Sequence, residues 1–263
     1  MPGRLPTKED FPPEVTLSIT PRKYCAYGCI FVCCLLICAA APASQPATNV
    51  LILLHGLGDT NASFTKLGLQ LNLPETACIA VQAPNGLLFD IGGFNWGDDL
   101  VVDQSTGELD MDTGFKTATR LILDRVVREG LVEKCGFKPR EIVLFGFAQG
   151  GMVGLQVAAE FHDNELGGVV SIGSGLSQSL PLKALEKKSK TPVLVCRASK
   201  GSKVTDSGVS KLKAAFENVE VKEWKRNGDG MMSNREEMLP IMQFFARRLL
   251  SRRGVPAGSV ELT

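Results

Sequence analysis

The sequence predicts an α/β fold, in which a mostly parallel sheet is covered by helices on both faces within a single domain. From Thr48 onward, short runs rich in Val, Ile and Leu alternate with longer helical patterns, which is the order produced by strands joined through crossover helices. The strand runs are almost continuously apolar, as expected where both faces are covered. The 263 residues suffice for one such domain with extra segments at its ends.

Six apolar runs are predicted to be strands of this sheet: residues 50–54, 78–82, 141–145, 167–172, 192–196 and 219–224. The clearest helix is predicted over residues 112–133, because its apolar residues fall on one stripe. A capping box formed by Ser233 and Glu236 precedes the last helix, which is expected to run through Arg247. Residues 14–19 could form an edge strand ahead of the domain.

Charge and composition exclude several classes of function. The chain carries 29 Lys and Arg against 28 Asp and Glu, a net charge of +1, so a dedicated nucleic-acid partner is not expected. Five of the eight cysteines crowd into one apolar run, which is no disulfide framework. The only histidines are His55 and His162, too few for zinc-finger spacing. The sequence therefore predicts no metal and no cofactor.

The N-terminal part, residues 1–47, differs from the predicted domain at 48–250 and from the tail at 251–263. Residues 24–41 are uncharged, rich in cysteine, and follow Arg22 and Lys23. As a helix this run would be about 27 Å long, just enough to cross a hydrocarbon core. It could be a signal anchor or late signal peptide, a reversibly acylated anchor, or a segment that is not native to the fold.

The third interpretation is favoured for a physical reason. If residues 14–19 and 50–54 pair in one sheet, a membrane span between them would place the two strands on opposite sides of a bilayer. Arg22-Lys23-Tyr24 can be encoded by codons that contain GUAAGU, which is similar to an intron donor, and Cys38-Ala39 can contain an acceptor-like CAG. We therefore hypothesise an unspliced intron and expect a cytoplasmic protein; a membrane anchor through residues 24–41 is the alternative.

Residues 141–154, EIVLFGFAQGGMVG, have the form of a nucleophile elbow. In the pattern G-x-S-x-G, the outer glycines allow a sharp turn from a strand into a helix and thrust the central side chain into the site. Gly146 and Gly150 hold the outer positions here, and Ala148 holds the centre. Taken alone, tight packing would explain this pattern equally well.

A second motif favours the functional interpretation. Residues 50–60, VLILLHGLGDT, place His55 and two glycines directly after a buried strand, where an α/β hydrolase has the loop that supplies an oxyanion donor. Further matching features are Ala83-Pro84, Trp96 within GGFNWGDD, and the turn at residues 111–114. Together these motifs resemble the phospholipase/carboxylesterase family, which includes the acyl-protein thioesterases, from about residue 48 to residue 250. The resemblance implies an α/β-hydrolase fold.

The resemblance also implies a serine esterase with a Ser in the elbow, an Asp after a later strand and a His before the last helix. The three matching positions are Ala148, a position near Gly201 and a position near Met231, so none of the three side chains is present. A methyl group has no lone pair with which to attack. The backbone amides of Leu57 and Gln149 are the implied oxyanion hole.

No other histidine is expected to replace the missing base. His162 lies fourteen residues along the helix that follows the elbow, roughly 21 Å from Ala148 at 1.5 Å per residue. His55 belongs to the oxyanion loop and is interpreted as structural. The other reactive side chains near strand ends are assigned to packing, turns or a solvated loop, because none has a partner base: Ser171, Ser174, Cys135, Cys196, Lys200 and Lys203.

The sequence thus predicts a pseudo-hydrolase that binds an acyl ester, a fatty-acyl group or an acylated peptide. Its acyl pocket is expected around Leu87, Leu88, Phe89 and Trp96. One alternative is an active carboxylic ester hydrolase or palmitoyl-protein thioesterase that uses other groups. Another is a folded relic, or the product of an incorrect gene prediction, with no site function.

Overall fold

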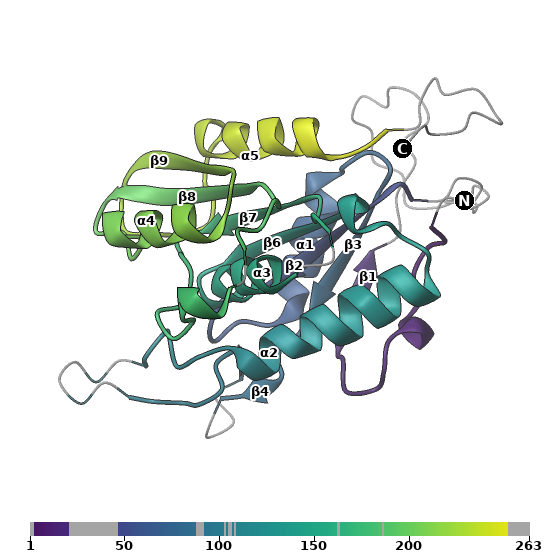
Figure 1. Ribbon diagram of the computed structural model, residues 1–263, viewed down its shortest axis with the longest axis horizontal. Helices are drawn as coiled ribbons and strands as arrows, with labels where there is room; N and C mark the ends of the chain where they lie inside the picture. Colours follow the sequence, from purple (N-terminus) through teal and green to yellow (C-terminus); the bar gives the residue numbers. More distant parts are fainter. Residues whose placement is uncertain are drawn as a thin grey trace, which may run out of the picture.

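The computed structural model describes residues 3–20, 47–87, 92–102, 104, 107, 109–161, 164–185 and 187–251. Within these residues the main strands are β1 (Leu17–Thr20), β2 (Asn49–Leu54), β3 (Thr76–Val81), β6 (Ile142–Phe147), β7 (Gly168–Ile172), β8 (Val193–Lys200) and β9 (Val219–Asn227). They form one sheet in the order β1-β3-β2-β6-β7-β8-β9 (Figure 1). All neighbours are parallel except β1, which is antiparallel to β3.

The fold class predicted from the sequence is confirmed, and each predicted strand is found within a few residues of its expected bounds. The largest difference is at the ends of β8 and β9, which continue to Lys200 and Asn227. These two residues pair with each other beyond the last paired residue of β7, Ile172. The pairing of these exposed strand ends cannot be inferred from apolar patterning, because it buries few side chains.

The main helices are α1 (Asn61–Leu71), α2 (Lys116–Arg120), α3 (Gln149–Glu160), α4 (Asp206–Ala215) and α5 (Arg235–Arg248). The helix predicted to start at residue 112 starts at Lys116 and continues as the π-helix η3 (Leu121–Lys134). Its first turn is held by the carboxylate of Asp98, which accepts hydrogen bonds from the amides of Lys116 and Thr117, each at 2.8 Å. Short elements complete the chain: η1 (Lys8–Asp10), β4 (Asn85–Gly86), β5 (Phe94–Asn95), η4 (Pro139–Glu141) and η5 (Leu182–Ala184).

The cap of the last helix lies one residue later than predicted. The side chain of Asn234, and not that of Ser233, accepts a hydrogen bond in the first turn, from the amide of Glu237 at 2.9 Å. The carboxylate of Glu237 in turn accepts from the amide of Ser233 at 2.8 Å. The capping box expected from Ser233 and Glu236 is therefore wrong by one position, because two acidic residues follow two possible cap residues in the sequence.

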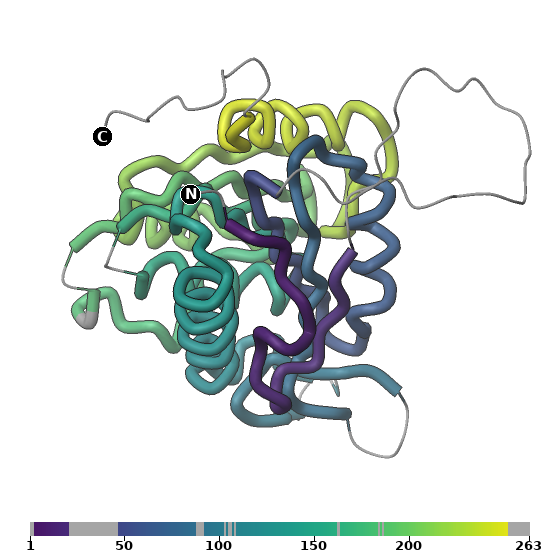
Figure 2. The backbone as a smooth tube through the Cα atoms, turned by 90° about the vertical axis from the view of Figure 1, so that its right-hand side faces the viewer, coloured from purple at the N-terminus to yellow at the C-terminus, as the bar shows by residue number. Residues whose placement is uncertain are grey.

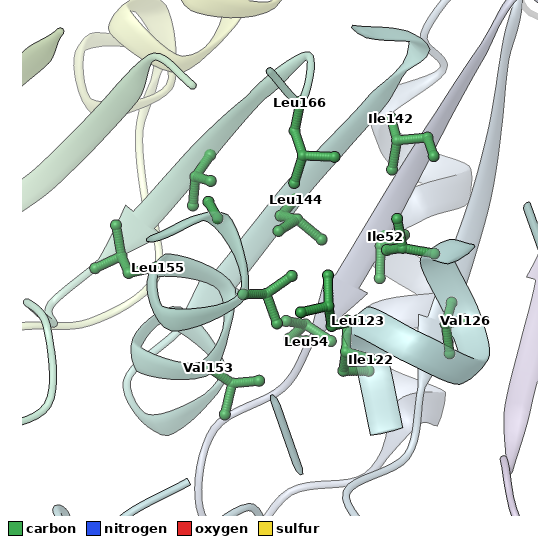
Figure 3. Close-up of a cluster of buried hydrophobic side chains, with 14 of the residues drawn as sticks. Ile52, Leu54, Ile122, Leu123, Val126, Ile142, Leu144, Val153, Leu155 and Leu166 are labelled. Carbon is green, nitrogen blue, oxygen red and sulfur yellow. The ribbon is translucent and has the colours of Figure 1, made fainter. Parts of the chain in front are cut away.

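Side chains that alternate along β2 build a separate core on each face of the sheet. Ile52 and Leu54 point toward the face covered by α2, η3, α3 and α4, whereas Leu51 and Leu53 point toward α1 and α5. Figure 3 shows the first of these cores, where Ile122 and Val153 meet strand residues from β2 and β6. Both faces of the central strands are buried, as their continuous apolar runs predicted, whereas the edge strand β9 is mostly exposed.

Residues 3–20 pack against the outside of η3 before entering the sheet as β1 (Figure 2). The amide of Arg4 donates to the carbonyl of Cys135 at 2.9 Å, and the ring of Phe11 lies so close to Gly130 that no side chain would fit there. The expected edge strand therefore forms, and β1 and β2 belong to one sheet. The expectations for residues 24–41 fall outside the described residues. In the described ranges, no helix combines the length and apolarity needed to span a bilayer.

Candidate functional site

The sharp turn predicted between strand and helix lies at Ala148. β6 ends at Phe147, α3 begins at Gln149, and Ala148 between them has φ 49° and ψ −119°. A residue with a Cβ rarely adopts a positive φ, so this backbone is strained. The amide of Ala148 donates to the carbonyl of Ile172 at 3.0 Å, which fixes the turn against the end of β7. The chain therefore has an elbow conformation with a methyl group at its tip.

Two glycines make the turn possible. A Cβ at Gly146 would overlap the backbone of Gly150, and a Cβ at Gly150 would overlap the carbonyl oxygens of Leu54 and His55. The spacing G-x-A-x-G is therefore required by the close approach of three backbone segments, as the elbow interpretation predicted. The same contacts show that β2 and the first turn of α3 touch directly.

Strand register brings the two implied oxyanion donors to the same edge of the sheet. Leu54 of β2 pairs with Gly146 of β6, so the loop that contains Leu57 and the elbow leave neighbouring strands at the same level. No hydrogen bond joins the amide of Leu57 or of Gln149 to any described residue. The amide of Gln149 also belongs to the first turn of α3, where the helix dipole favours negative charge. We name the amides of Leu57 and Gln149 the cradle amides.

His55 is fully buried, and its ring is engaged on both nitrogens. Nε2 accepts a hydrogen bond from the amide of Ala83 at 3.0 Å, and Nδ1 lies 2.7 Å from the carbonyl of Gly56. Because a backbone amide can only donate, the Nδ1 nitrogen carries the proton. Burial lowers the pKa of His55, so the ring stays neutral. This geometry agrees with a structural role and leaves no nitrogen free to act as a base.

The two residues at which the family resemblance implies the acid and the base, Gly201 and Met231, carry no ionisable side chain. Gly201 has a φ of 64°, and a Cβ there would lie 2.9 Å from Oδ1 of Asn227, so a carboxylate at this position would be strained. Met231 packs its side chain against the core on the α5 face. Its carbonyl accepts a hydrogen bond from the guanidinium of Arg226 at 3.1 Å.

Asp229 is a carboxylate near the elbow to which sequence analysis gave no role. Its oxygens accept hydrogen bonds from the amides of Ala198 and Lys203, at 2.8 and 2.7 Å, and from the hydroxyl of Ser202 at 2.9 Å. Asp229 follows β9, whereas its three partners lie at the end of β8 and in the loop before α4. It thus ties together the two loops in which the triad Asp and His were expected. The one signal in the sequence is an isolated acid in the NGDG turn.

Asp229 also lies beside the flank of the elbow. A Cβ built at Gly173 would lie 2.7 Å from the Cβ of Asp229, and Gly173 directly follows Ile172, whose carbonyl binds the amide of Ala148. Asp229 therefore packs against the residue that follows the hydrogen-bond partner of Ala148. Three donors already use the oxygens of Asp229, so its carboxylate mainly holds the loop after β9 to the end of β8 and the loop before α4.

The other reactive side chains in this region lack the partners needed for catalysis. Ser171 and Ser174 are buried with their hydroxyl oxygens 2.9 Å apart, and both face Gly151 of α3. Burial raises the pKa of Cys135 to about 11 and that of Cys196 to about 12, so both thiols stay protonated. Lys200 and Lys203 are exposed. His162 lies outside the described residues; α3 ends two residues before it, at Glu160.

The expected acyl pocket is only partly described. Leu87 is half-buried, and its side chain lies 3.9 Å from a Cβ built at Gly58, beside the loop that carries Leu57. Trp96 is fully buried, and its indole nitrogen donates to the carbonyl of His55 at 2.7 Å. Leu88 and Phe89 lie outside the described residues, so the pocket stays a prediction. In the described part of the chain, no group of three or more metal-ligating side chains comes together.

The sheet order, the strained elbow and the adjacent glycine loop define an α/β-hydrolase. Residues 37–247 match the sequence model of the phospholipase/carboxylesterase family, and the chain belongs to that family. An uncharacterized hydrolase from Schizosaccharomyces pombe is 28% identical over 221 residues, which are 82% of this chain and 89% of the relative. Acyl-protein thioesterase 1 from Saccharomyces cerevisiae is 30% identical over 141 residues, 49% of this chain and 58% of that protein. The crystal structure of esterase PE8 has a similar fold, with a TM-score of 0.66 at 20% identity, over 89% of this chain and 99% of that one.

Proposed function

We propose that this member of the family binds an acyl ester or an acylated peptide without hydrolysing it. The observation that carries the proposal is Ala148, which places a methyl group at the tip of the elbow. Acyl transfer by this kind of site requires an atom that attacks the carbonyl carbon. A methyl group cannot form the covalent acyl intermediate.

The engagement of His55 and Asp229 in the fold supports the proposal that no base serves this position. His55 is the only described imidazole, and both of its nitrogens are in hydrogen bonds within the fold. The carboxylate of Asp229 is held by three donors. Restoring the nucleophile alone would therefore leave it without a group to take its proton.

The cradle amides support binding. Two main-chain donors that no described acceptor uses, one of them at the start of α3, suit a carbonyl oxygen that carries partial negative charge. Family membership and the name of the yeast relative, acyl-protein thioesterase 1, favour an acyl group as the ligand. In serine proteases that lack a triad member, the oxyanion hole and substrate binding together retain on the order of 10³ to 10⁴ of acceleration over water, so any background turnover at the cradle amides would be far below that of a useful esterase.

Thermal-shift titration with palmitate and with an S-palmitoylated cysteine peptide tests binding. A ligand at a hundred times its dissociation constant should stabilise the fold by about 2.7 kcal/mol. Ala148→Gln is the matched control, because its longer side chain would occupy the space above the cradle amides. Absence of any shift with both ligands would contradict the proposal.

The variant Ala148→Ser tests the missing base. We expect hydrolysis of a nitrophenyl acyl ester to rise less than about tenfold, whereas loss of the serine from a complete triad costs on the order of 10⁶. The wild-type protein should not react with a fluorophosphonate probe. Strong activity of Ala148→Ser, or labelling of the wild type, would show that a base reaches this position.

A further inference from the structure

Residues 93–96 contact both of the loops that carry the cradle amides. On one side, the amide of Gly58 donates to the carbonyl of Phe94 at 2.9 Å, and the amide of Phe94 donates back to the same loop at 3.1 Å. On the other side, the amide of Trp96 donates to Oε1 of Gln149 at 3.1 Å. The segment therefore bridges the loop after β2 and the start of α3. We name residues 93–96 the brace.

The contacts of the brace leave little room for adjustment. A Cβ at Gly93 would overlap the carbonyl of Gly58, so the two backbones are in direct contact. The indole nitrogen of Trp96 donates to the carbonyl of His55 at 2.7 Å. The centroids of the Trp96 and His55 rings lie 5.2 Å apart. The brace is thus fixed to the loop after β2 at three points, Gly58, Asp59 and His55.

The side chain of Gln149 is the link between the brace and α3. It is fully buried, its Oε1 accepts from the amide of Trp96, and its Nε2 donates to the carbonyl of Met111 at 3.3 Å. Gln149 therefore supplies one cradle amide from its main chain and holds the brace with its side chain. An apolar residue there would leave the buried amide of Trp96 without an acceptor, which would weaken the contact between the brace and α3.

We propose that Gln149 is a positioning residue, whose side chain acts through the brace to set the amide of Leu57 relative to its own amide. This inference rests on the proposed binding function, because the separation of the cradle amides matters only if a ligand oxygen binds between them. Preorganised donors stabilise a developing or partial charge more than mobile ones do. The carboxamide would thus determine affinity without touching the ligand.

Hydrogen exchange in the ligand-free protein tests the brace directly. In Gln149→Met, which has a similar volume but neither hydrogen bond, we expect the amide of Gly58 to exchange at least about tenfold faster, although its hydrogen bond is to Phe94 and not to Gln149. Gln149→Glu keeps an acceptor for Trp96 and should stay within about threefold of wild type. Gln156→Met is the matched control: Gln156 is buried on the same helix, but its side chain bonds only Glu160, at 2.9 Å.

Unchanged exchange at Gly58 in Gln149→Met, or an equal increase in Gln156→Met, would overturn the inference. If Gln149→Met does not fold, Gln149→Asn replaces it, since the side chain shortened by one methylene no longer reaches the amide of Trp96, and exchange at Gly58 should again be faster. Calorimetry with the S-palmitoylated peptide should show affinity at least about tenfold weaker in Gln149→Met than in Gln149→Glu. If the wild type binds no acyl ligand, the proposed function fails, while the exchange experiment still decides the role of Gln149.

Discussion

The candidate site has two sides that depend on different kinds of group: a cradle side, formed by the loops after β2 and β6, and a relay side, formed by the loops after β8 and β9. On the cradle side, the loops after β2 and β6 keep the glycines, the strained elbow and the buried contacts that two main-chain donors require. On the relay side, the loops after β8 and β9 carry Gly201, Asp229 and Met231 where the family resemblance implies an acid and a base. Main-chain donors depend on packing, whereas proton transfer depends on particular side-chain atoms. The main-chain donors of the cradle side can therefore be kept while the side chains of the relay side are replaced.

The largest effect is expected from Gly150→Ala on the cradle side. The new Cβ would overlap two backbone carbonyl oxygens, of Leu54 and His55; Leu54 is held in β2, and the carbonyl of His55 accepts the hydrogen bond of the Trp96 indole. We expect a loss of about 3 kcal/mol or more in the free energy of unfolding, measured by urea denaturation. Gly154→Ala is the control on the same helix, where the nearest atom lies 3.6 Å from the new Cβ, and a gain of about 0.5–1 kcal/mol is expected. Similar values for both variants would contradict a closely packed cradle.

On the relay side, Asp229→Ala should cost about 2–3 kcal/mol of unfolding free energy. The substitution leaves two amides and one hydroxyl without their acceptor. Asp206→Ala is the control, because the Asp206 side chain is 92% exposed and its ion pair with Arg197 should contribute less than about 0.5 kcal/mol. Hydrogen exchange at Gly58 should not change in Asp229→Ala. An increase there would show that the two sides are coupled.

Ala148→Gly should stabilise the protein. Glycine adopts the positive φ of the elbow without strain, and this gain exceeds its greater loss of chain entropy, for a net effect of about 1 kcal/mol. Ala214→Gly in the exposed face of α4 is the control and should lose about 0.5–1 kcal/mol. Both variants are measured by thermal and urea unfolding. Equal losses of unfolding free energy in the two would mean that the backbone at Ala148 is not strained.

The last prediction concerns pH. Because burial lowers the pKa of His55 in the fold, the unfolded chain binds more protons just below the ordinary value of 6.5. Stability should therefore fall as the pH is lowered from about 7 to about 5, by at most about 1.4 kcal/mol per pH unit from this residue. His55→Gln should flatten the profile, whereas His162→Gln serves as the control. If His55→Gln leaves the pH profile unchanged, protonation of His55 does not contribute to the pH dependence of unfolding.

Particular residues show how far sequence reasoning reached. The elbow around Ala148 and the glycines on either side follow from local pattern, because a strand, a sharp turn and a helix must be adjacent in the chain. The start of the helix at Lys116 did not follow, since its cap, Asp98, lies eighteen residues earlier. Asp229 was visible as an isolated acid, but its partners come from another loop. Gln149 was noted only for its amide, because the contact of its side chain with Trp96 joins distant segments.

The sequence by itself determined the order of strands and helices, the place of the elbow and the absence of a nucleophile there. Each of these is set by residues adjacent in the chain, through periodicity, glycine spacing and the identity of one side chain. Only the tertiary structure decided that Asp229 ties the loops after β8 and β9, and that the brace joins the two cradle loops. Those contacts depend on which strands are neighbours in the sheet, and parallel pairing brings together residues that are far apart in the chain.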